Sequence, residues 1–472
     1  MVEYPMLLAL LLLPEISKAA TVELAPGDDW CGALRAAAPM DTILLAPGEY
    51  AGPCTIDHGG TEGSPVTLAA ADPAAPPHIA YMGTSSNVID VLASDVTLRG
   101  LAFGPTEANI DAVKIKSGSR VAVEDSVFTG IGGISVSANS ADGANNAVLA
   151  CTFTDLNATA LYFGCHDGSC VQTDIRIEDN TFDGITSDAV GYALEIKLDS
   201  WGMVARNSIR DTKGPGIEIY GSSDRSGEGS VPSVVEQNLV WGGASGAIEI
   251  GGGPAIVRNN IVVGSVGGGI VSYDYGGRGL VQGVHIVGNT VIGDGGAAIA
   301  ASGWSADADL ELWGNAVYAR SGGSALPAEV SGVPMASNLE CGEGCFVDAA
   351  TLDLWPAPEG GLVDAAEPAA DPLVDDFCGR SRDGSPDIGA LERSGGEDPG
   401  ALAFGPYADF DCALSWGDTA GTDEDALGGD CGCASTPIPA SAFGFALCAS
   451  MLAYRRRRAA PCPAVRTRRA DC

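Results

Sequence analysis

Short segments in the middle of the chain alternate apolar and polar residues with a period of two, as β-strands do. One such segment, of the form apolar-x-apolar-x-x-Asn-x-apolar, recurs at intervals of 22 to 31 residues. Each copy leads through a glycine-rich turn into a second short strand, as in "GIEIYG" and "AIEIGGG". Self-similarity at this period indicates a solenoid, in which no unit buries its apolar side without its neighbours. The recurring asparagines are Asn180, Asn207, Asn238, Asn260, Asn289 and Asn315.

No segment of the repeat has helical spacing, so we expect an all-β, right-handed parallel β-helix of about ten coils. An asparagine at an inward bend can hydrogen-bond its equivalents above and below, roughly 4.8 Å away. The six asparagines therefore predict an internal ladder. Upstream of them, Ser126 and Cys151 occupy the same position of the repeat.

The repeats and the segment before them resemble right-handed parallel β-helix proteins of the pectate-lyase-like class. "DDWCGALRAAAPMDTILLAPGEYAG" is similar to the N-terminal cap that precedes the first coil in such proteins. The resemblance covers residues 21–337 and is specific for the fold but weakly informative about chemistry. Residues 338–393 end in "GRSRDGSPDIGALE", which is similar to the closing segment of a module found after such helices, and predict a C-terminal cap.

The two ends of the chain predict export and anchoring. Residues 1–20 combine an apolar run with small residues suited to cleavage, as a signal peptide does. Residues 394–430 are acidic, lack Lys and Arg, and predict a disordered, flexible linker. A plain membrane-spanning anchor is one interpretation of the apolar run and four arginines that follow.

The same tail, residues 431–458, resembles a myxobacterial C-terminal sorting signal, because a cysteine motif precedes the apolar segment and the arginines. That resemblance implies recognition by sorting and processing machinery at Cys431 or Cys433. It also implies a location at the cell surface or outer membrane, with release as a further option. Residues 459–472 form an atypical extension beyond the arginines.

Composition narrows the range of partners. The formal net charge of −36 would repel phosphate backbones, so we expect no nucleic-acid binding, and we expect a monomer. Close cysteine pairs in an exported chain with four histidines favour disulfides over metal sites. The predicted disulfides are Cys31–Cys54, Cys165–Cys170 and Cys341–Cys345.

The second strands of successive repeats place three glutamates in one outward-facing column: Glu195, Glu218 and Glu249. Their apolar neighbours face inward, since alternate side chains point to opposite sides of a strand. Like charges roughly 5 Å apart raise one another's pKa or recruit a cation. No cofactor is required, but Ca²⁺ is a candidate ligand of this column. The same alignment also places Ser135 in it.

Two positions along, the alignment adds a base and two aromatic rings: Lys197, Tyr220 and Tyr273. Tyrosines can pack against sugar faces, and a lysine can neutralise a uronate or abstract its C5 proton. "LEIK", which holds Glu195 and Lys197, is loosely similar to the glutamate-and-lysine strand of β-helical polysaccharide lyases. Tyr220 stands where those enzymes have a second basic residue, and Arg225 on a following loop is the candidate substitute.

Three functions are compatible with this set of residues. The one we favour is binding of extracellular or envelope polysaccharide through the three glutamates and two tyrosines. The second is catalysis, either by a lyase that uses Lys197 and Arg225 or by a hydrolase that uses Glu218. The third is a structural or adhesive spacer whose glutamates form a solvated face, since the outside of any β-helix must be polar. The sequence leaves open whether the chain is an enzyme.

Overall fold

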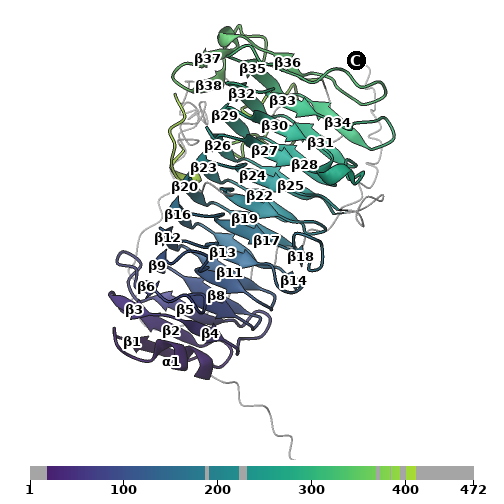
Figure 1. The fold of residues 1–472 in the computed structure, drawn as a ribbon. Coiled ribbons are helices and arrows are strands. Elements are labelled where there is room, and N and C mark those ends of the chain that lie inside the picture. Colours follow the sequence, from purple (N-terminus) through teal and green to yellow (C-terminus); the bar gives the residue numbers. More distant parts are fainter. Residues whose placement is uncertain are drawn as a thin grey trace, which may run out of the picture. The chain divides into compact units, whose positions relative to one another are not determined.

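A computed structural model describes residues 19–186, 191–222, 231–367, 373–382, 384–393 and 400–410 of the 472. The chain winds through three parallel sheets of 12, 12 and 10 strands, which amounts to about eleven turns (Figure 1). The predicted all-β solenoid is therefore confirmed. Within the described residues, α1 (Trp30–Ala36) is the one α-helix, and it lies before the first complete turn.

Each turn contributes one strand to each sheet in the order first, second, third. The first sheet consists of β1 (Thr21–Leu24), β2 (Thr42–Leu45), β5 (Val66–Ala70), β8 (Val96–Arg99), β11 (Val121–Glu124), β15 (Ala147–Leu149), β19 (Ile175–Glu178), β22 (Gly202–Ala205), β25 (Ser233–Glu236), β28 (Ala255–Arg258), β31 (Val284–Val287) and β34 (Leu310–Trp313). The second consists of β3 (Glu49–Ala51), β6 (His78–Tyr81), β9 (Ala102–Thr106), β12 (Val127–Thr129), β16 (Thr152–Leu156), β20 (Thr181–Ile185), β23 (Ser208–Thr212), β26 (Leu239–Trp241), β29 (Ile261–Ser265), β32 (Thr290–Gly293), β35 (Ala316–Ala319) and β36 (Leu339–Glu340). The third consists of β4 (Cys54–Ile56), β7 (Ile89–Val91), β10 (Val113–Ile115), β13 (Val136–Ala138), β17 (Leu161–Phe163), β21 (Leu194–Ile196), β24 (Ile217–Ile219), β27 (Gly246–Ile250), β30 (Gly268–Ser272) and β33 (Ile299–Ala301).

Four short strands and three 3₁₀ helices lie in turns or near the C-terminus. A parallel pair, β14 (Gly143–Ala144) and β18 (Gln172–Thr173), joins two neighbouring turns. An antiparallel pair, β37 (Phe346–Asp348) and β38 (Asp353–Pro356), follows the last turn. The 3₁₀ helices are η1 (Tyr275–Gly277), η2 (Glu343–Cys345) and η3 (Tyr407–Asp409).

The interior is built from the same position of successive turns. Ile217 pairs with Leu194 on one side and Ile248 on the other, and all three are fully buried. Larger residues stack in the same way. Phe103, Phe128, Phe153 and Phe182 form a continuous column with ring centroids 4.8 to 4.9 Å apart. One-residue slips would expose such columns, so the register is strongly specified.

The predicted asparagine ladder is confirmed. The side-chain nitrogen of Asn207 donates to the side-chain oxygen of Asn238 over 2.9 Å, and its backbone N–H donates to the same oxygen over 2.9 Å. All six asparagines repeat this pattern. The ladder continues one turn further than predicted, because Asn315 donates to Asn338 over 2.8 Å. At its other end, the backbone N–H of Cys151 donates to Asn180 over 2.9 Å.

The segment after the last turn folds back over the outer face of the second sheet. Trp355 and Phe377 are buried there against the outward side chains of β26 and β29. Arg382 donates to the side-chain oxygen of Asn259 over 3.0 Å, and Gln237 donates to the backbone oxygen of Asp376 over 2.9 Å. The stack itself runs past the predicted boundary at residue 337, since β36 still pairs with β35.

Two of the three predicted disulfides are present, Cys31–Cys54 and Cys165–Cys170. The predicted Cys341–Cys345 disulfide is wrong: both are free, buried thiols that hydrogen-bond each other. Cys341 extends the ladder of β36 by donating its backbone N–H to Val317, whereas Cys345 closes η2. Burial raises the pKa of Cys341 and so keeps it in the thiol form, which is not the form that reacts to make a disulfide.

Several predictions concern parts of the chain outside the described residues. They are most of the signal peptide, Arg225, most of the acidic linker, the tail with Cys431 and Cys433, and the extension at 459–472. Within the described part of the chain, no helix has the length and hydropathy needed to cross a membrane.

Candidate functional site

The three predicted glutamates lie on neighbouring turns of the third sheet. Glu195 on β21 pairs with Glu218 on β24, which pairs with Glu249 on β27. Tyr162 precedes them in the column. The placement of Ser135 in this column is wrong, because Ser137 pairs with Tyr162 instead. The alignment slipped there by two residues at a glycine-rich turn.

These side chains point away from the core, yet they are not solvated. Glu195, Glu218 and Lys197 are 2%, 1% and 4% exposed. The expectation of a solvated face is therefore wrong for this part of the sheet. The physical reason is that aromatic side chains from neighbouring turns close over the column, as Tyr220 does with 5% of its own surface exposed.

Glu195 and Lys197 form a buried ion pair, between Nζ of Lys197 and Oε2 of Glu195. The hydroxyl of Tyr220 donates to the same Oε2 over 3.1 Å. The other carboxylate oxygen accepts from Thr159 Oγ1 over 3.3 Å. A buried charge is tolerated when it is paired and hydrogen-bonded in this way.

Aromatic rings enclose the ammonium group of Lys197. Its nitrogen lies 4.0 Å from the ring centroid of Tyr220 and 4.5 Å from that of Tyr162. The ring of Tyr192 is also near, at 6.0 Å. Cation–π attraction favours a cation over ring faces at these distances, so the lysine is held by its rings as well as by its carboxylate.

Glu218 and Glu249 are paired carboxyl groups on neighbouring strands. Burial, followed by repulsion from Glu249, raises the pKa of Glu218 well above its usual range. The hydroxyl of Tyr273 donates to Glu218 over 2.8 Å. Glu249 accepts from Ser245 and from the backbone of Gly246, each over 3.0 Å.

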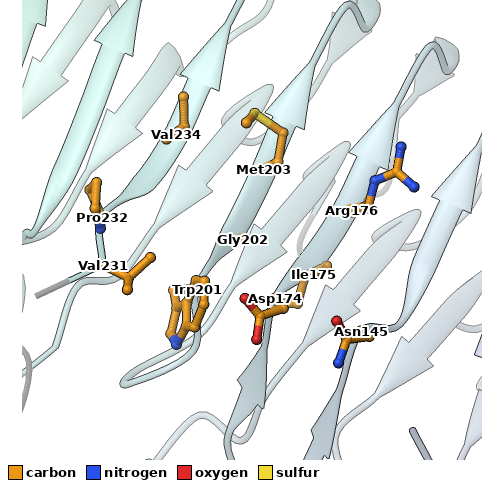
Figure 2. A pocket seen from close by; sticks show the side chains of 10 residues that line it. All are labelled: Asn145, Asp174, Ile175, Arg176, Trp201, Gly202, Met203, Val231, Pro232 and Val234. Carbon is orange, nitrogen blue, oxygen red and sulfur yellow. The ribbon is translucent and has the colours of Figure 1, made fainter. Parts of the chain in front are cut away.

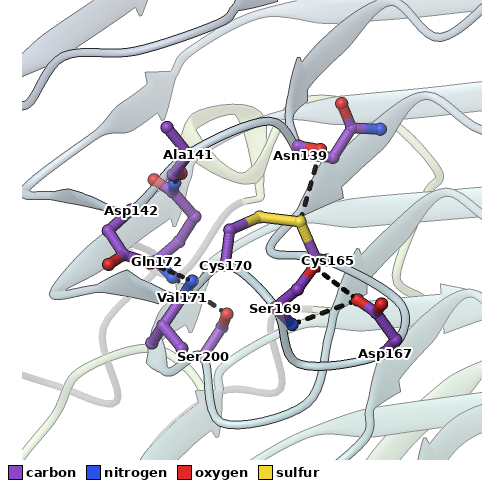
Figure 3. Close-up of a disulfide and its surroundings, with 10 residues drawn as sticks. All are labelled: Asn139, Ala141, Asp142, Cys165, Asp167, Ser169, Cys170, Val171, Gln172 and Ser200. Carbon is purple, nitrogen blue, oxygen red and sulfur yellow. Dashed lines mark hydrogen bonds between the residues drawn. A yellow bond between two sulfur atoms is a disulfide. The ribbon is translucent and has the colours of Figure 1, made fainter.

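A loop closed by a disulfide places a further aromatic side chain, that of His166, beside the buried charged residues. Figure 3 shows Cys165 bonded to Cys170, with the side chain of Asp167 accepting from Ser169 inside the loop. The loop carries His166, whose ring meets Tyr275 edge-on at 6.3 Å. Tyr275 in turn meets Tyr220 edge-on at 4.6 Å. The disulfide thus constrains the loop whose His166 packs against Tyr275.

The outermost groups of this assembly are half-buried and reach solvent. They are Tyr162, Tyr192, Tyr273, Tyr275 and Glu249. Burial raises the pKa of Tyr162 to about 12, and it raises those of Tyr192 and Tyr273. These phenols are therefore protonated at neutral pH and act as hydrogen-bond donors rather than as bases.

The three glutamates do not converge on one cation. Among the described residues, no group of three or more His, Cys, Asp and Glu side chains is arranged to hold a metal ion. Glu195 already pairs with Lys197, and Glu218 accepts from Tyr273. The donor set as placed does not fit Ca²⁺, and calcium binding by this column stays a prediction.

Sequence reasoning missed part of this assembly. The sequence alignment already puts Tyr162 in the glutamate column, as the structure does, but it was not chosen as a site residue. Thr159, His166, Tyr192 and Tyr275 lie in turns and loops, outside the strands that the repeat aligns. No spacing rule relates them to the column.

The region that contains the site also matches a known family. Residues 79–291 match the family described as "Right handed beta helix region". This matched region runs from β6 to β32 and includes every residue of the candidate site. No curated protein sequence matches the chain.

Solved structures with the same kind of fold are distant. The chain is 16% identical to the pectate lyase Pel9A, with 80% of this chain and 98% of that chain covered and a TM-score of 0.45. It is 16% identical to an alginate lyase from Paenibacillus sp. str. FPU-7, with 68% and 99% covered and a TM-score of 0.40. It is 15% identical to the PL6 family polysaccharide lyase Pedsa3628 from Pseudopedobacter saltans, with 78% of this chain and 99% of that chain covered and a TM-score of 0.42. At these identities the likeness concerns the fold alone.

Proposed function

We propose that this chain binds extracellular or envelope polysaccharide on the outer face of the third sheet. The observation that carries the proposal is a group of four half-buried tyrosines that surround buried charged side chains. The tyrosines are Tyr162, Tyr192, Tyr273 and Tyr275, and the charged residues are Glu195, Lys197 and Glu218. The rings offer flat apolar surface to sugar faces, and their hydroxyls and Glu249 offer hydrogen bonds to sugar hydroxyls.

The free-energy cost of burying these charged side chains supports a functional role. Removing an ion from water costs several kcal/mol even after relaxation, and a polar outer face has no need of it. Perturbed ionisable groups in one place are candidates for functional sites. Here the Glu195–Lys197 pair and Glu218 hold the surrounding tyrosines in fixed positions through hydrogen bonds and ring contacts.

A glycan panel in native affinity gels tests this proposal. The full chain is run through gels that contain neutral or acidic polysaccharides, with Ca²⁺ or with a chelator. We expect retardation by at least one glycan and a loss of about thirtyfold in affinity for Tyr275→Ala, since about 2 kcal/mol is typical of an aromatic anchor. Tyr318→Ala, a half-buried tyrosine on β35, is the matched control. Equal retardation of both variants, or none on any glycan, would contradict the proposal.

A polysaccharide lyase is the second candidate. The observation in its favour is that a lysine and a carboxyl group whose pKa is raised by burial, Lys197 and Glu218, lie in adjacent turns of one assembly. In an elimination, a base removes the C5 proton of a uronate, the C4–O bond breaks, a C4–C5 double bond forms, and an acid protonates the leaving oxygen. Lys197 and Glu218 have the types of side chain that these two roles need, and Arg225 is the other sequence candidate.

The enclosure of Lys197 favours binding over elimination. Its nitrogen is surrounded by a carboxylate and ring faces, and the residue is 4% exposed, so a uronate reaches the rings before the amine. Absorbance of unsaturated products separates the two functions. Product from the wild type and none from Lys197→Met would establish the lyase, whereas no product with retained binding supports our proposal.

Hydrolysis by Glu218 and Glu249 is less well supported. Catalytic carboxyl groups of glycosidases lie about 5 to 9.5 Å apart, with a sugar or water between them. These two are register partners on adjacent parallel strands, and the spacing of strands in any such sheet produces carboxyl pairs of this kind. A non-catalytic spacer is the outcome if no glycan binds.

We also propose that the chain is exported and held at the cell surface through its tail. Cell fractionation of the wild type and of Cys431→Ala and Cys433→Ala variants tests this. Retention of both variants at the surface would argue against sorting through these cysteines and for a plain anchor.

A further inference from the structure

A hollow lies on the outer face of the first sheet, away from the candidate site. Its volume is about 350 Å³, which is at the small end of the roughly 300 to 1,000 Å³ typical of ligand pockets. The hollow spans the starts of β19, β22 and β25, and none of its lining residues belongs to the candidate site on the third sheet. Figure 2 shows Trp201 between Asp174 and Val231 at this place.

The repeat brings three different side chains to one turn position. Ile175 pairs with Gly202, so Asp174 and Trp201 occupy equivalent places just before β19 and β22. Asn145 stands close to that place one turn earlier, where its backbone N–H donates to Thr173. Asn145 and Asp174 have positive φ angles of 57° and 52°, a conformation that asparagine and aspartate tolerate better than most residues.

The chemistry of the hollow is amphipathic. Met203 and Val234 lie on its sheet side and Val231, which is 50% exposed, on its rim. Within the described residues, neither the amide of Asn145 nor the carboxylate of Asp174 hydrogen-bonds another group, and both residues are exposed. An indole beside apolar side chains, with an amide and a carboxylate at the edge, matches a sugar ring, which has an apolar face and equatorial hydroxyls.

We propose that this hollow is a second carbohydrate site, for one or two neutral sugar residues of a glycan. Trp201 packs against the apolar face of a sugar ring, and Asp174 and Asn145 hydrogen-bond its hydroxyls. The charge selects against uronates: Asp174 is anionic, and the neighbouring Arg176 is bound to Glu178 over 2.6 and 3.1 Å. The chain as a whole carries −36.

This site goes beyond the proposed function, because it lies on another sheet and selects a neutral ligand. If both sites bind one polysaccharide, the second event is intramolecular and strengthens attachment without new contacts. The hollow nevertheless stands as a site of its own, whatever the third sheet binds.

Calorimetry with the full chain and defined trisaccharides tests the proposal. The probes are cellotriose, mannotriose, maltotriose and chitotriose, with trigalacturonate as the anionic comparator. We expect at least one neutral trisaccharide to bind, about tenfold more weakly to Trp201→Ala and about threefold more weakly to Asp174→Asn, with trigalacturonate weaker than the best neutral probe.

Two further variants keep the outcome interpretable. Val234→Lys replaces one apolar lining residue with a longer, charged side chain that reaches over the hollow, and we expect it to abolish binding with an unchanged thermal midpoint. Tyr318→Ala, on β35 and in neither site, should leave trisaccharide binding unchanged. The proposal is overturned if no neutral trisaccharide binds, if trigalacturonate binds best, or if Trp201→Ala and Val234→Lys bind like the wild type. A loss in Tyr275→Ala alone would assign the binding to the third sheet.

Discussion

Two rows of buried polar side chains run across the turns of this molecule, and they differ in kind. Inside the coil, the ladder repeats one neutral residue, and each amide is satisfied by the identical amide of the next turn. Outside the third sheet, the row holds three glutamates on successive turns, carries charge, and is satisfied by unlike partners. The repeat explains the first row completely. It explains only the position of the second, which is therefore the row that has a local purpose.

Breaking the internal row should have the largest effect on stability. Asn238 accepts from the backbone and side chain of Asn207, and its own amide donates to Val204, Glu236 and Asn260. Asn238→Leu leaves several of these buried groups unpaired, at about 1–3 kcal/mol each. We expect a loss of about 4 kcal/mol in the free energy of unfolding, measured by urea denaturation.

Exposed Asn157 supplies the matched control for this measurement. Asn157→Ala should change stability by less than about 0.5 kcal/mol, as surface substitutions usually do. A loss below about 1 kcal/mol for Asn238→Leu would mean that neighbouring amides re-pair without it, and that the ladder is not needed.

In the outer row, removing one charge should cost more than removing both. Lys197→Met leaves Glu195 buried without its ammonium partner, and breaking a buried pair in this way costs about 3–5 kcal/mol. The double variant Glu195→Gln with Lys197→Met removes both charges and should recover most of that loss. A double-mutant cycle by denaturation measures the difference. If the two single losses simply add, the charges do not depend on each other.

The carboxyl pair should make stability depend on pH. The pKa of Glu218 is raised in the folded protein from the usual 4.5, so the folded chain keeps a proton that the unfolded chain releases above that pH. The associated stability is complete below pH 4.5 and is lost as the pH rises through the folded pKa. Glu218→Gln mimics the protonated form, so its stability relative to the wild type should increase from pH 5 to pH 9.

Thermal midpoints across this range check the prediction. Glu107→Gln, at an exposed glutamate, controls for the loss of one formal charge. A constant difference between Glu218→Gln and the wild type from pH 5 to pH 9 would show that Glu218 does not hold a proton in the folded state.

The smallest expected effect is a change in glycan affinity that leaves the stability of the fold nearly unchanged. Tyr273 and Tyr275 are half-buried, and their outer edges face solvent. Tyr273→Phe keeps the ring and removes one hydrogen bond to Glu218, worth about 0.5–1.5 kcal/mol. We expect a severalfold loss of glycan affinity in gels with a thermal midpoint within a few degrees of the wild type. An unchanged affinity would place the sugar away from Tyr273.

The fold was predictable because a coil repeats its own sequence. Six asparagines in phase fixed the register of the interior, and alternation placed Ile217 and Ile219 inside. Asn338 was not predicted as part of the ladder, because the residues around it no longer follow the motif. The order of Glu195, Glu218 and Glu249 also followed from the alignment, as did the position of Lys197.

The burial of the site was not predictable from that alignment. Tyr192, Tyr275 and His166 reach the column from turns of variable length, whose paths depend on three-dimensional packing rather than on the repeat. Cys341 and Cys345 show the same limit. Their spacing permits a disulfide, but strand pairing and burial left both as thiols.

The most direct test of the account is glycan binding by the charge-neutral double variant, Glu195→Gln with Lys197→Met. Native affinity gels and thermal unfolding are measured on the same samples, beside the wild type. We predict a folded protein with most of the wild-type stability and a loss of at least about tenfold in glycan affinity, because the rings around Lys197 lose the cation that positions them. Wild-type retardation by this variant would contradict the account and make the buried charges a part of the scaffold alone.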